Sequence, residues 1–242
     1  MLQSSQGSMT RGHRPPGGGS EKAQAKARRI LEAAMRHFAR AGYGAARIED
    51  IAAELQIAKG SVFQHFGSKE ALFLAAYKEA IGSFSAYLDA PPEVVARGFF
   101  ATLAYWLERT DRLVRENWVP YRLALIGNYA SDLALRREIN RFLVAEDPYG
   151  AMDFVRMGIA RGEVRADVDP EMTASILEWT VERFQDALLT EELDPGLFPR
   201  AKNRSEKTRE RIAQFLKILE SALASPAGTR SRGPARRSHR RR

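Results

Sequence analysis

The sequence predicts an all-α protein of about nine helices, with a small three-helix part at the N-terminus and a larger helical part after it. Apolar residues recur at spacings of three and four through most of the chain, which is the period of a helix with one buried face. No segment shows the strict alternation of apolar and polar residues that is typical of a half-buried strand. Gly, Pro and Asp fall between the periodic segments, where helices begin and end.

The first three helices follow closely on one another. The first begins near Glu21 and is expected to stop at Gly42, because glycine takes the left-handed conformation that closes a helix. A second helix is expected over residues 47–55 and a third over residues 59–66, joined by a three-residue turn. Two short helices joined in this way can pack at a steep angle on a supporting first helix. The apolar face of the first helix consists of Ala27, Ile30, Leu31, Ala34 and Phe38.

Three further helices are expected before residue 130. Ser68 is expected to cap a fourth helix over residues 69–88, since a serine oxygen can accept a free amide of the first turn. A fifth helix should begin at Pro91-Pro92 and continue to Leu107. Asp111 is expected to cap the sixth, and Pro120 is expected to kink it.

The remaining helices have clearer boundaries. One is expected from Ser131-Asp132 to Asp147-Pro148 and another around residues 154–162. Asp169 followed by Pro170 indicates a helix start, because Asp caps well and Pro fits the first helical position. After a loop, the last helix is expected over residues 205–224. The apolar stripes of the last two helices are Ile176, Leu177, Val181, Phe184 and Leu188, then Ile212, Phe215, Leu216, Leu219 and Leu223.

Both ends of the chain differ from the rest in composition. Residues 1–20 are rich in Gly, Ser, Gln and Pro and are expected to form a disordered basic arm. Residues 226–242 contain seven arginines and no acidic residue and are expected to form a disordered tail. The tail accounts for most of the net charge of +8, because the other residues together carry only +1. The basic composition alone is therefore weak evidence for nucleic-acid binding.

Composition also argues against several classes of protein. The chain has no cysteine, which excludes disulfides, thiol catalysis and Cys-ligated zinc. Its four histidines are scattered, and it contains neither a Glu-x-x-His pair nor a phosphate-binding Gly-Lys-Ser/Thr loop. We therefore expect no catalytic residues, no metal and no cofactor. No apolar run approaches the roughly 20 residues that span a membrane, and no export signal precedes the helices, so we expect a cytoplasmic protein without a membrane partner.

Residues 29–72 carry the most informative pattern. In order they contain Arg29-Ile30-Leu31-Glu32-Ala33-Ala34, His37-Phe38, Gly42-Tyr43, Asp50-Ile51-Ala52, Ile57-Ala58-Lys59-Gly60-Ser61-Val62-Phe63-Gln64-His65-Phe66 and Ser68-Lys69-Glu70-Ala71-Leu72. Apolar, small and basic residues in this order and spacing resemble the DNA-binding domain of the TetR family of transcriptional regulators. The resemblance covers about a fifth of the chain.

The resemblance implies a helix-turn-helix DNA-binding domain over residues 21–68 and a ligand-binding and dimerisation domain over residues 69–225. The pattern itself places Lys59, Ser61 and Gln64 outward, toward base edges or phosphates of a major groove. Small side chains at the start of the third helix allow close approach to DNA. The full set of expected DNA contacts is Arg47, Lys59, Gly60, Ser61, Phe63, Gln64, His65 and Lys69.

Several positions depart from the pattern that the family usually shows. Gln56 stands where the turn usually has Gly, and Ala58 stands where Ser or Thr usually caps the recognition helix. Phe63 replaces the usual Tyr, so one phosphate-directed hydroxyl is missing. Ala46-Arg47 replaces a usual pair of threonines, and Arg47 would supply a charge-assisted phosphate contact instead. These departures affect DNA affinity more than the fold.

The residues after the fourth helix carry no comparable motif. We expect a pocket among the middle helices and a homodimer that uses the stripes of the last two helices, although both sets of residues would equally serve a monomer core. A dimer would hold two recognition helices about 34 Å apart, as successive major grooves require. The expected pocket residues are Tyr105, Trp106, Trp118, Tyr121, Arg122, Trp179 and Glu182.

These observations favour a transcriptional repressor that leaves operator DNA when an unknown small, mostly apolar effector binds. A shift in the population of dimer geometries would change the spacing of the recognition helices, with the fourth helix as the connection. Two alternatives remain open. One is an enzyme, and the other is a helical ligand-binding or adaptor protein of the same fold in which operator binding is weak or lost.

Overall fold

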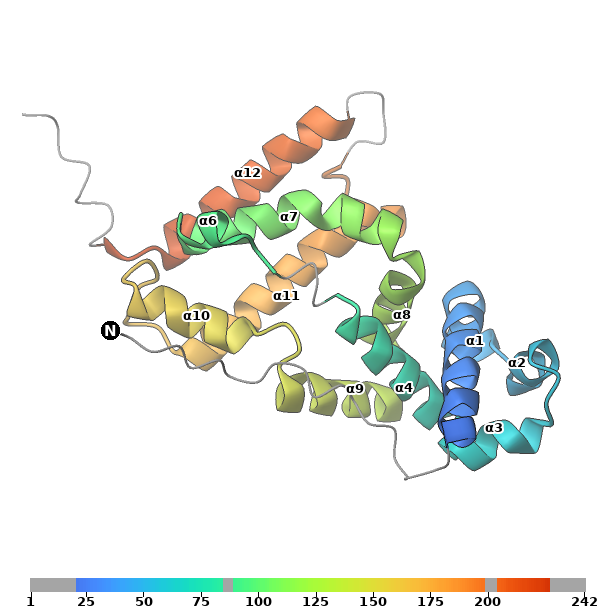
Figure 1. The fold of residues 1–242 in the computed structure, drawn as a ribbon. Coiled ribbons are helices and arrows are strands. Elements are labelled where there is room, and N and C mark those ends of the chain that lie inside the picture. Colours follow the sequence, from blue (N-terminus) through green and yellow to red (C-terminus); the bar gives the residue numbers. More distant parts are fainter. Residues whose placement is uncertain (1–20, 85–88, 199–203, 227–242) are drawn as a thin grey trace, which may run out of the picture. The chain divides into compact units, whose positions relative to one another are not determined.

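The computed structural model describes residues 21–84, 89–198 and 204–226, so the expected N-terminal arm and almost all of the expected arginine-rich tail lie outside it. In the described ranges the chain forms eleven α-helices, one short 3₁₀ helix and no strand, which confirms the all-α prediction (Figure 1). The chain divides into two compact units, Met1–Ala76 and Tyr77–Arg242. The boundary falls inside helix α4 (Lys69–Gly82).

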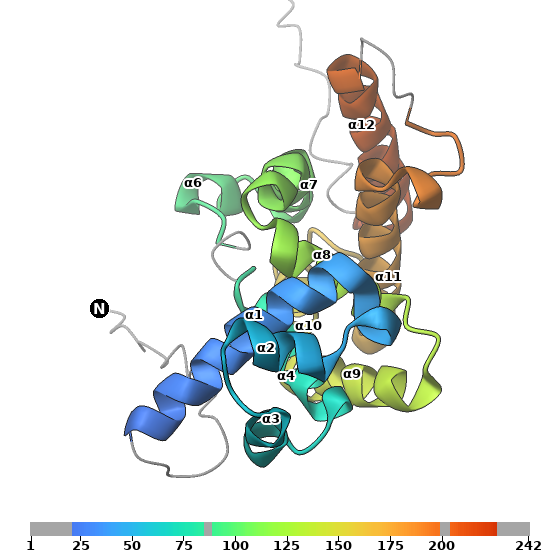
Figure 2. The ribbon, with the colours of Figure 1, turned by 90° about the vertical axis from the view of Figure 1, so that its right-hand side faces the viewer.

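The N-terminal unit consists of α1 (Glu21–Ala45), α2 (Ile48–Glu54), α3 (Lys59–Phe66) and the first part of α4. The first three helices pack on one another, as Figures 1 and 2 show. Phe38 and Phe73 meet edge to face with their ring centroids 5.1 Å apart. The buried side chains of this unit include Ile30, Ala34, Phe38, Ile48, Ile51, Val62, Leu72 and Phe73.

Two expected helix boundaries in this unit are confirmed. Gly42 has a φ of 77°, and one further turn of α1 follows it to Ala45. The Ser68 side-chain oxygen accepts a hydrogen bond from the Ala71 amide at 3.0 Å and so caps α4. Helix α4 itself ends at Gly82 instead of near residue 88, and residues 85–88 lie outside the described ranges.

The second unit contains seven further α-helices and the 3₁₀ helix. Asp169 begins α11 as predicted, because its side chain accepts the Met172 amide at 2.7 Å and Pro170 is the first helical residue. The elements are α6 (Pro92–Val95), α7 (Phe99–Glu116), α8 (Trp118–Asn128), α9 (Leu133–Glu146), α10 (Ala151–Ala160), α11 (Pro170–Leu189), η1 (Glu191–Leu193) and α12 (Arg204–Leu223).

The helix expected at Pro91-Pro92 does start there, but it does not continue to Leu107, and the helix start expected at Asp111 is wrong. The helix that starts at Pro92 has a single turn, and Gly98 follows it with a φ of 107°, a conformation that interrupts a helix. A new helix, α7, therefore begins at Phe99 and runs without a break through residue 111 to Glu116. The division raises the number of helices above the nine expected.

The kink expected at Pro120 is also absent. The chain breaks earlier, at Asn117, whose φ of −132° and ψ of 48° lie outside the helical range. Helix α8 starts at Trp118, which places Pro120 in its first turn. A proline is tolerated there because the amide that it lacks would have no partner within the helix.

Two aspartates set the ends of α9 and the start of α10. Asp132 accepts hydrogen bonds from two amides of the first turn of α9, as the sequence predicted. Asp147 ends α9 in a left-handed conformation with a φ of 37°. Its side chain then accepts the Ala151 amide of α10 at 3.0 Å. One residue thus closes one helix and caps the next.

The core of the second unit uses most of the stripes that suggested a dimer interface. Helix α11 packs against α7 and α10, and α7 packs against α12. The Phe184 ring of α11 stacks on the Phe215 ring of α12 with centroids 4.1 Å apart. The stripe residues that lie in or against this core are Leu177, Val181, Phe184, Leu188, Ile212, Phe215, Leu216, Leu219 and Leu223. These residues stabilise the single chain, and Ile176 alone of the two stripes is exposed.

Candidate nucleic-acid interface

Helices α2 and α3 are joined by a tight turn over residues 55–58. The Ile57 amide donates to the Ala52 carbonyl at 3.0 Å, which folds the turn back on α2. Gln56 stands where the family usually has glycine, and its φ of 55° shows that this position takes the left-handed conformation. A residue with a side chain costs about 1 kcal/mol there. The turn therefore keeps its shape in spite of Gln56.

The recognition-helix candidate α3 starts without a side-chain cap. Ala58 occupies the capping position in an extended conformation, and its methyl group has no oxygen to accept the free amides. The loss predicted from the sequence is thus present in the structure and amounts to roughly 0.5–2 kcal/mol.

One side of α3 is buried and the other is exposed. Val62 is 1% exposed and anchors the helix in the core of the unit. Lys59, Gly60 and Gln64 are exposed. The structure gives space around Gly60, where an added Cβ would meet nothing within 4 Å. The exposed side of α3, defined here by Lys59, Gly60 and Gln64, is therefore polar, free of bulk at its start and held by a buried anchor.

Lys59 is already engaged in the unit. Its ammonium lies 2.7 Å from Glu49 Oε1, in the first turn of α2. The same ammonium lies 5.5 Å from the centroid of the Phe63 ring, which is half-buried. The hydrogen bond from Lys59 is the main cause that lowers the pKa of Glu49. Glu49 was not among the predicted site residues, because a separation of ten residues across a turn gives no signal in the sequence.

Ser61 lies toward α1 more than toward solvent. It is half-buried, and its hydroxyl accepts a hydrogen bond from the Lys26 ammonium at 3.2 Å. Of the three residues expected to point outward, Lys59 and Gln64 are therefore the exposed ones. His65 is half-buried on α3.

Basic residues also lie at the starts of α2 and α4. Arg47 is exposed and precedes the first residue of α2 in an extended conformation. The Lys69 ammonium donates to the Gly44 carbonyl at 3.0 Å and lies 5.0 Å from the centroid of the Tyr43 ring. Lys69 thus ties the start of α4 to the end of α1. The amides at the start of α4 present partial positive charge, which suits a phosphate.

A second contact missed by the sequence holds α2 against α1. Glu54, the last residue of α2, accepts a hydrogen bond from Arg36 at 2.5 Å and lies 2.7 Å from His37 Nε2. The hydrogen bond from Arg36 and then that from His37 lower the pKa of Glu54. These groups are partly exposed, so they orient α2 more than they stabilise it.

The predicted pocket residues of the second unit lie in separate surroundings. Trp118 and Trp179 are 55% and 62% exposed. The Arg122 guanidinium lies over the Trp118 ring, 5.7 Å from its centroid. Trp106 packs against the Phe154 ring, and Tyr105 lies under the guanidinium of Arg109. Of the seven predicted pocket residues, Tyr121 and Glu182 belong to a polar network of buried and partly buried hydrogen bonds.

A polar network joins α4, α8 and α11 inside the second unit. The Tyr77 hydroxyl donates to Asn128 Oδ1 at 2.8 Å, and the Asn128 amide donates to Glu182. Glu178 and Asp186 lie one turn before and one turn after Glu182 on α11. Burial, and then the negative charge of Asp186 and Glu178, raises the pKa of Glu182 from 4.5 to about 7. Burial also raises the pKa of Glu178 and of Asp186.

Tyr121 closes the other end of this network. Its hydroxyl lies 3.0 Å from the Thr190 hydroxyl and donates to Asp186 at 3.4 Å. Burial is the main cause that raises its pKa above the usual value. The network therefore places three carboxylates on one face of α11 among neutral donors.

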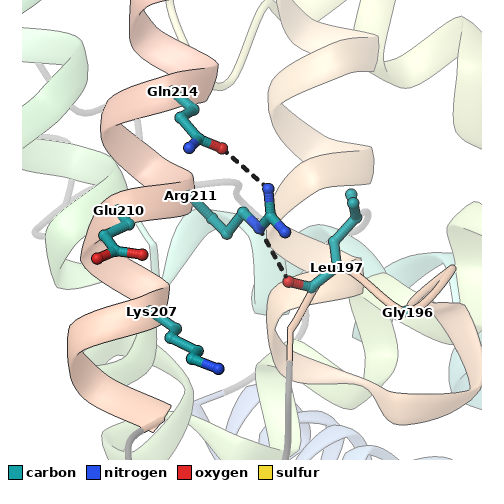
Figure 3. Close-up of a pocket in the computed structure, with 6 residues that line it drawn as sticks. All are labelled: Gly196, Leu197, Lys207, Glu210, Arg211 and Gln214. Atoms are coloured by element: carbon teal, nitrogen blue, oxygen red, sulfur yellow. Dashed lines mark hydrogen bonds between the residues drawn. The ribbon is translucent and has the colours of Figure 1, made fainter.

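A surface pocket of about 240 Å³ lies elsewhere in the second unit, between residues 196–197 and α12. Figure 3 shows Arg211 bridging it, with one hydrogen bond to the Leu197 carbonyl at 3.2 Å and one to Gln214 at 2.9 Å. Its remaining lining residues are Gly196, Lys207 and Glu210. None of the predicted pocket residues lines it.

No group of three or more His, Asp or Glu side chains in the described ranges is placed to hold a metal ion. None of the helices in these ranges is both long and apolar enough to cross a membrane.

The chain is similar in sequence to known bacterial transcriptional regulators. Residues 30–76 match the family model described as bacterial regulatory proteins, tetR family. The chain is 34% identical to the HTH-type transcriptional repressor Rv1474c of Mycobacterium tuberculosis H37Rv over 199 residues, which cover 82% of this chain and 93% of that protein. It is 28% identical to the repressor AcnR of Corynebacterium glutamicum over 170 residues, 69% of this chain and 84% of that one.

Solved structures have the same fold. A TetR regulator from Chloroflexus aurantiacus matches with a TM-score of 0.59 at 22% identity, over 85% of this chain and all of that one. The regulator FadR from Bacillus subtilis, solved in complex with stearoyl-CoA, matches with a TM-score of 0.59 at 18% identity, over 80% of this chain and 97% of that one.

Proposed function

The chain belongs to the TetR family of bacterial transcriptional regulators, and from this membership we propose that it is a repressor that binds operator DNA and leaves it when a small organic effector binds. The observation that carries the proposal is the exposed side of α3, which is polar, is open around Gly60 and is anchored from behind by Val62. A helix presented in this way fits the major groove of duplex DNA.

The roles of the side chains follow from their chemistry. The Gln64 amide is suited to read an adenine through its N6 and N7 atoms, and the Lys59 ammonium is suited to a guanine edge or a phosphate. Arg47 and Lys69, at the starts of α2 and α4, are placed to contact phosphates and set the register. Phe63 lacks the hydroxyl that a tyrosine would offer to a phosphate. Ser61 and His65, which are half-buried on the same helix, are the residues that could make this phosphate contact instead.

We also propose that the protein works as a homodimer. The stripe residues of α11 and α12 are used inside the single chain, but α11 exposes a second apolar face. Met172, Ile176 and Trp179 on that face are 55%, 46% and 62% exposed, and Ile218 of α12 is 68% exposed. Burial of such residues favours association. Sedimentation equilibrium of the purified chain tests this part, and a monomer at micromolar concentration contradicts it.

The effector is proposed to be a small, mostly apolar organic molecule that binds in the second unit. It would act by favouring a dimer geometry whose recognition helices do not match the operator. This function requires no catalysis, metal or cofactor, and it places the protein in the cytoplasm with the DNA. A compound that raises the melting temperature of the protein but leaves its operator affinity unchanged would contradict the release mechanism.

The experiment that tests the proposed function is a titration of DNA from upstream of the protein's own coding region against a scrambled duplex of the same length. We expect sequence preference and an affinity that falls steeply with salt, because phosphate contacts release counterions. The double variant Lys59→Ala/Gln64→Ala should lose about tenfold or more in affinity for the upstream DNA, since a good base contact contributes about 1–3 kcal/mol.

The control for this experiment is the structure of the variant. Its circular dichroism and its oligomeric state should match the wild type, because both side chains are exposed. Binding that shows neither sequence preference nor dependence on Lys59 and Gln64 would favour the second candidate, a ligand-binding or adaptor protein of the same fold. The missing cap at Ala58 and the missing hydroxyl at Phe63 are the observations that favour this candidate.

A further inference from the structure

We propose that Glu49 limits the affinity of this protein for DNA by competing with the nucleic acid for the Lys59 ammonium. The inference rests on the proposed function, since it concerns the surface through which α3 would meet DNA. The other residues named on this surface are proposed to strengthen DNA binding, whereas Glu49 would weaken it. Glu49 would thereby set how firmly the repressor holds its operator.

The geometry of the pair carries the inference. Glu49 lies in the first turn of α2 and Lys59 is the first residue of α3, so the ion pair bridges the two helices at the start of α3. Its Nζ–Oε1 distance is 2.7 Å, and the Lys59 and Glu49 side chains remain 50% and 49% exposed. The carboxylate is therefore placed beside the exposed side of α3 and is open to solvent there.

The pair is not required to hold α2 and α3 together. Ile51 of α2 is fully buried and Val62 of α3 is 1% exposed, so both helices are anchored in the core of the unit. Exposed ion pairs of this kind contribute little to stability. The position of Glu49 thus matters more for the charge that the unit presents than for its folding.

Competition follows from the chemistry of the two partners. A DNA phosphate or a guanine edge needs the same N–H donors that Glu49 Oε1 now accepts. If Lys59 keeps Glu49, the charge of its ammonium is already paired and attracts the phosphates less strongly. If Lys59 leaves Glu49, the ion pair is lost. Either course weakens binding.

The lowered pKa of Glu49 agrees with this picture. The hydrogen bond from Lys59 is its main cause, so the carboxylate stays charged throughout the neutral range. The competition is therefore present under the conditions in which a repressor works. A moderate operator affinity also suits regulation, because an effector with modest preference for one state can then release the protein.

The test compares wild type, Glu49→Gln, Lys59→Ala and the double variant on the upstream DNA. Glu49→Gln keeps the size of the side chain and removes its charge. It should tighten binding by about threefold to tenfold and steepen the dependence of log K on log salt by about one phosphate contact. In the Lys59→Ala background the same change should give only the small gain that comes from removing any exposed negative charge near the phosphates, because the ammonium for which Glu49 competes is gone.

Asp50→Asn is the matched control, since Asp50 is the next residue, is also exposed and also lies in the first turn of α2. An equal gain from Asp50→Asn and Glu49→Gln, or a gain from Glu49→Gln that is undiminished without Lys59, would overturn the inference and leave the proposed function intact. Absence of sequence-preferring binding by the wild type would instead overturn the proposed function. Melting temperatures of all variants show whether each one is folded.

Discussion

Replacing Glu182 with glutamine is expected to raise the free energy of unfolding of the second unit by about 3 kcal/mol at pH 8. Burial and the neighbouring carboxylates raise the pKa of Glu182 from 4.5 to about 7, a difference that corresponds to about 3 kcal/mol. Glutamine has nearly the same shape, bears no charge and can still accept the hydrogen bond from Asn128. The variant therefore mimics the protonated carboxyl.

The sign of the pH dependence follows from proton binding. In the unfolded chain the Glu182 carboxyl loses its proton near pH 4.5, whereas in the folded protein it keeps the proton to about pH 7. The folded state binds more protons between these values, so the free energy of unfolding of the wild type falls as the pH rises through this window. At pH 5 the free energy of unfolding of Glu182→Gln should exceed that of the wild type by less than about 1 kcal/mol.

The measurement is urea unfolding at pH 5 and pH 8, followed by tryptophan fluorescence. Trp106, Trp118 and Trp179 are the three tryptophans of the chain and all lie in the second unit, so the signal reports on that unit. Glu220→Gln, at an exposed position of α12, is the control and should leave the pH dependence of the wild type in place. A Glu182→Gln variant that unfolds at lower urea than the wild type at pH 8 would contradict the assignment of a buried, costly charge.

Local signals predicted helix ends well. Ser68, Asp132 and Asp169 cap helices as expected, because the amides of the first turn have no partner within the helix and a side-chain oxygen two or three residues earlier can accept them. The left-handed conformation of Gln56 agrees with the glycine that the family usually has at this position. These features depend on a few neighbouring residues.

Other helix ends depend on more than local signals. Asp111 has the chemistry of a cap, but α7 begins at Phe99 and runs through this position to Glu116. Pro120 has the chemistry of a kink, but the chain breaks three residues earlier and the proline falls in the first turn of α8. In both cases a local signal allowed more than one helix boundary, and the sequence alone did not decide between them.

Contacts between helices were the least predictable part of the candidate site. The pattern identified Lys59 and Gln64 as exposed, and both are exposed in the structure, with Gln64 on the side of α3 opposite the buried Val62. It gave no indication that Lys59 binds Glu49 or that Lys26 binds Ser61, because both contacts depend on how the helices are packed. For the same reason, the predicted aromatic pocket residues turned out to be divided between core and surface.

Replacing Gly60 with alanine is expected to weaken binding to the upstream DNA by about tenfold or more while the protein stays folded. The added methyl group would meet nothing within 4 Å in the free protein. Alanine also favours the helix by up to about 1 kcal/mol relative to glycine. In the complex the same methyl group would meet the DNA, and overpacking of a close contact costs about 1–3 kcal/mol. Stability and binding should therefore change in opposite directions.

The dissociation constant of the Gly60→Ala variant for the upstream duplex shows whether the exposed side of α3 enters a groove of the DNA. Gly82→Ala provides the comparison, since Gly82 is an exposed glycine at the end of α4 with nothing within 4 Å of an added Cβ. We expect weaker binding for Gly60→Ala, wild-type binding for Gly82→Ala and a melting temperature no lower than that of the wild type for both. Wild-type affinity in a folded Gly60→Ala protein would show that this side of α3 does not enter the groove.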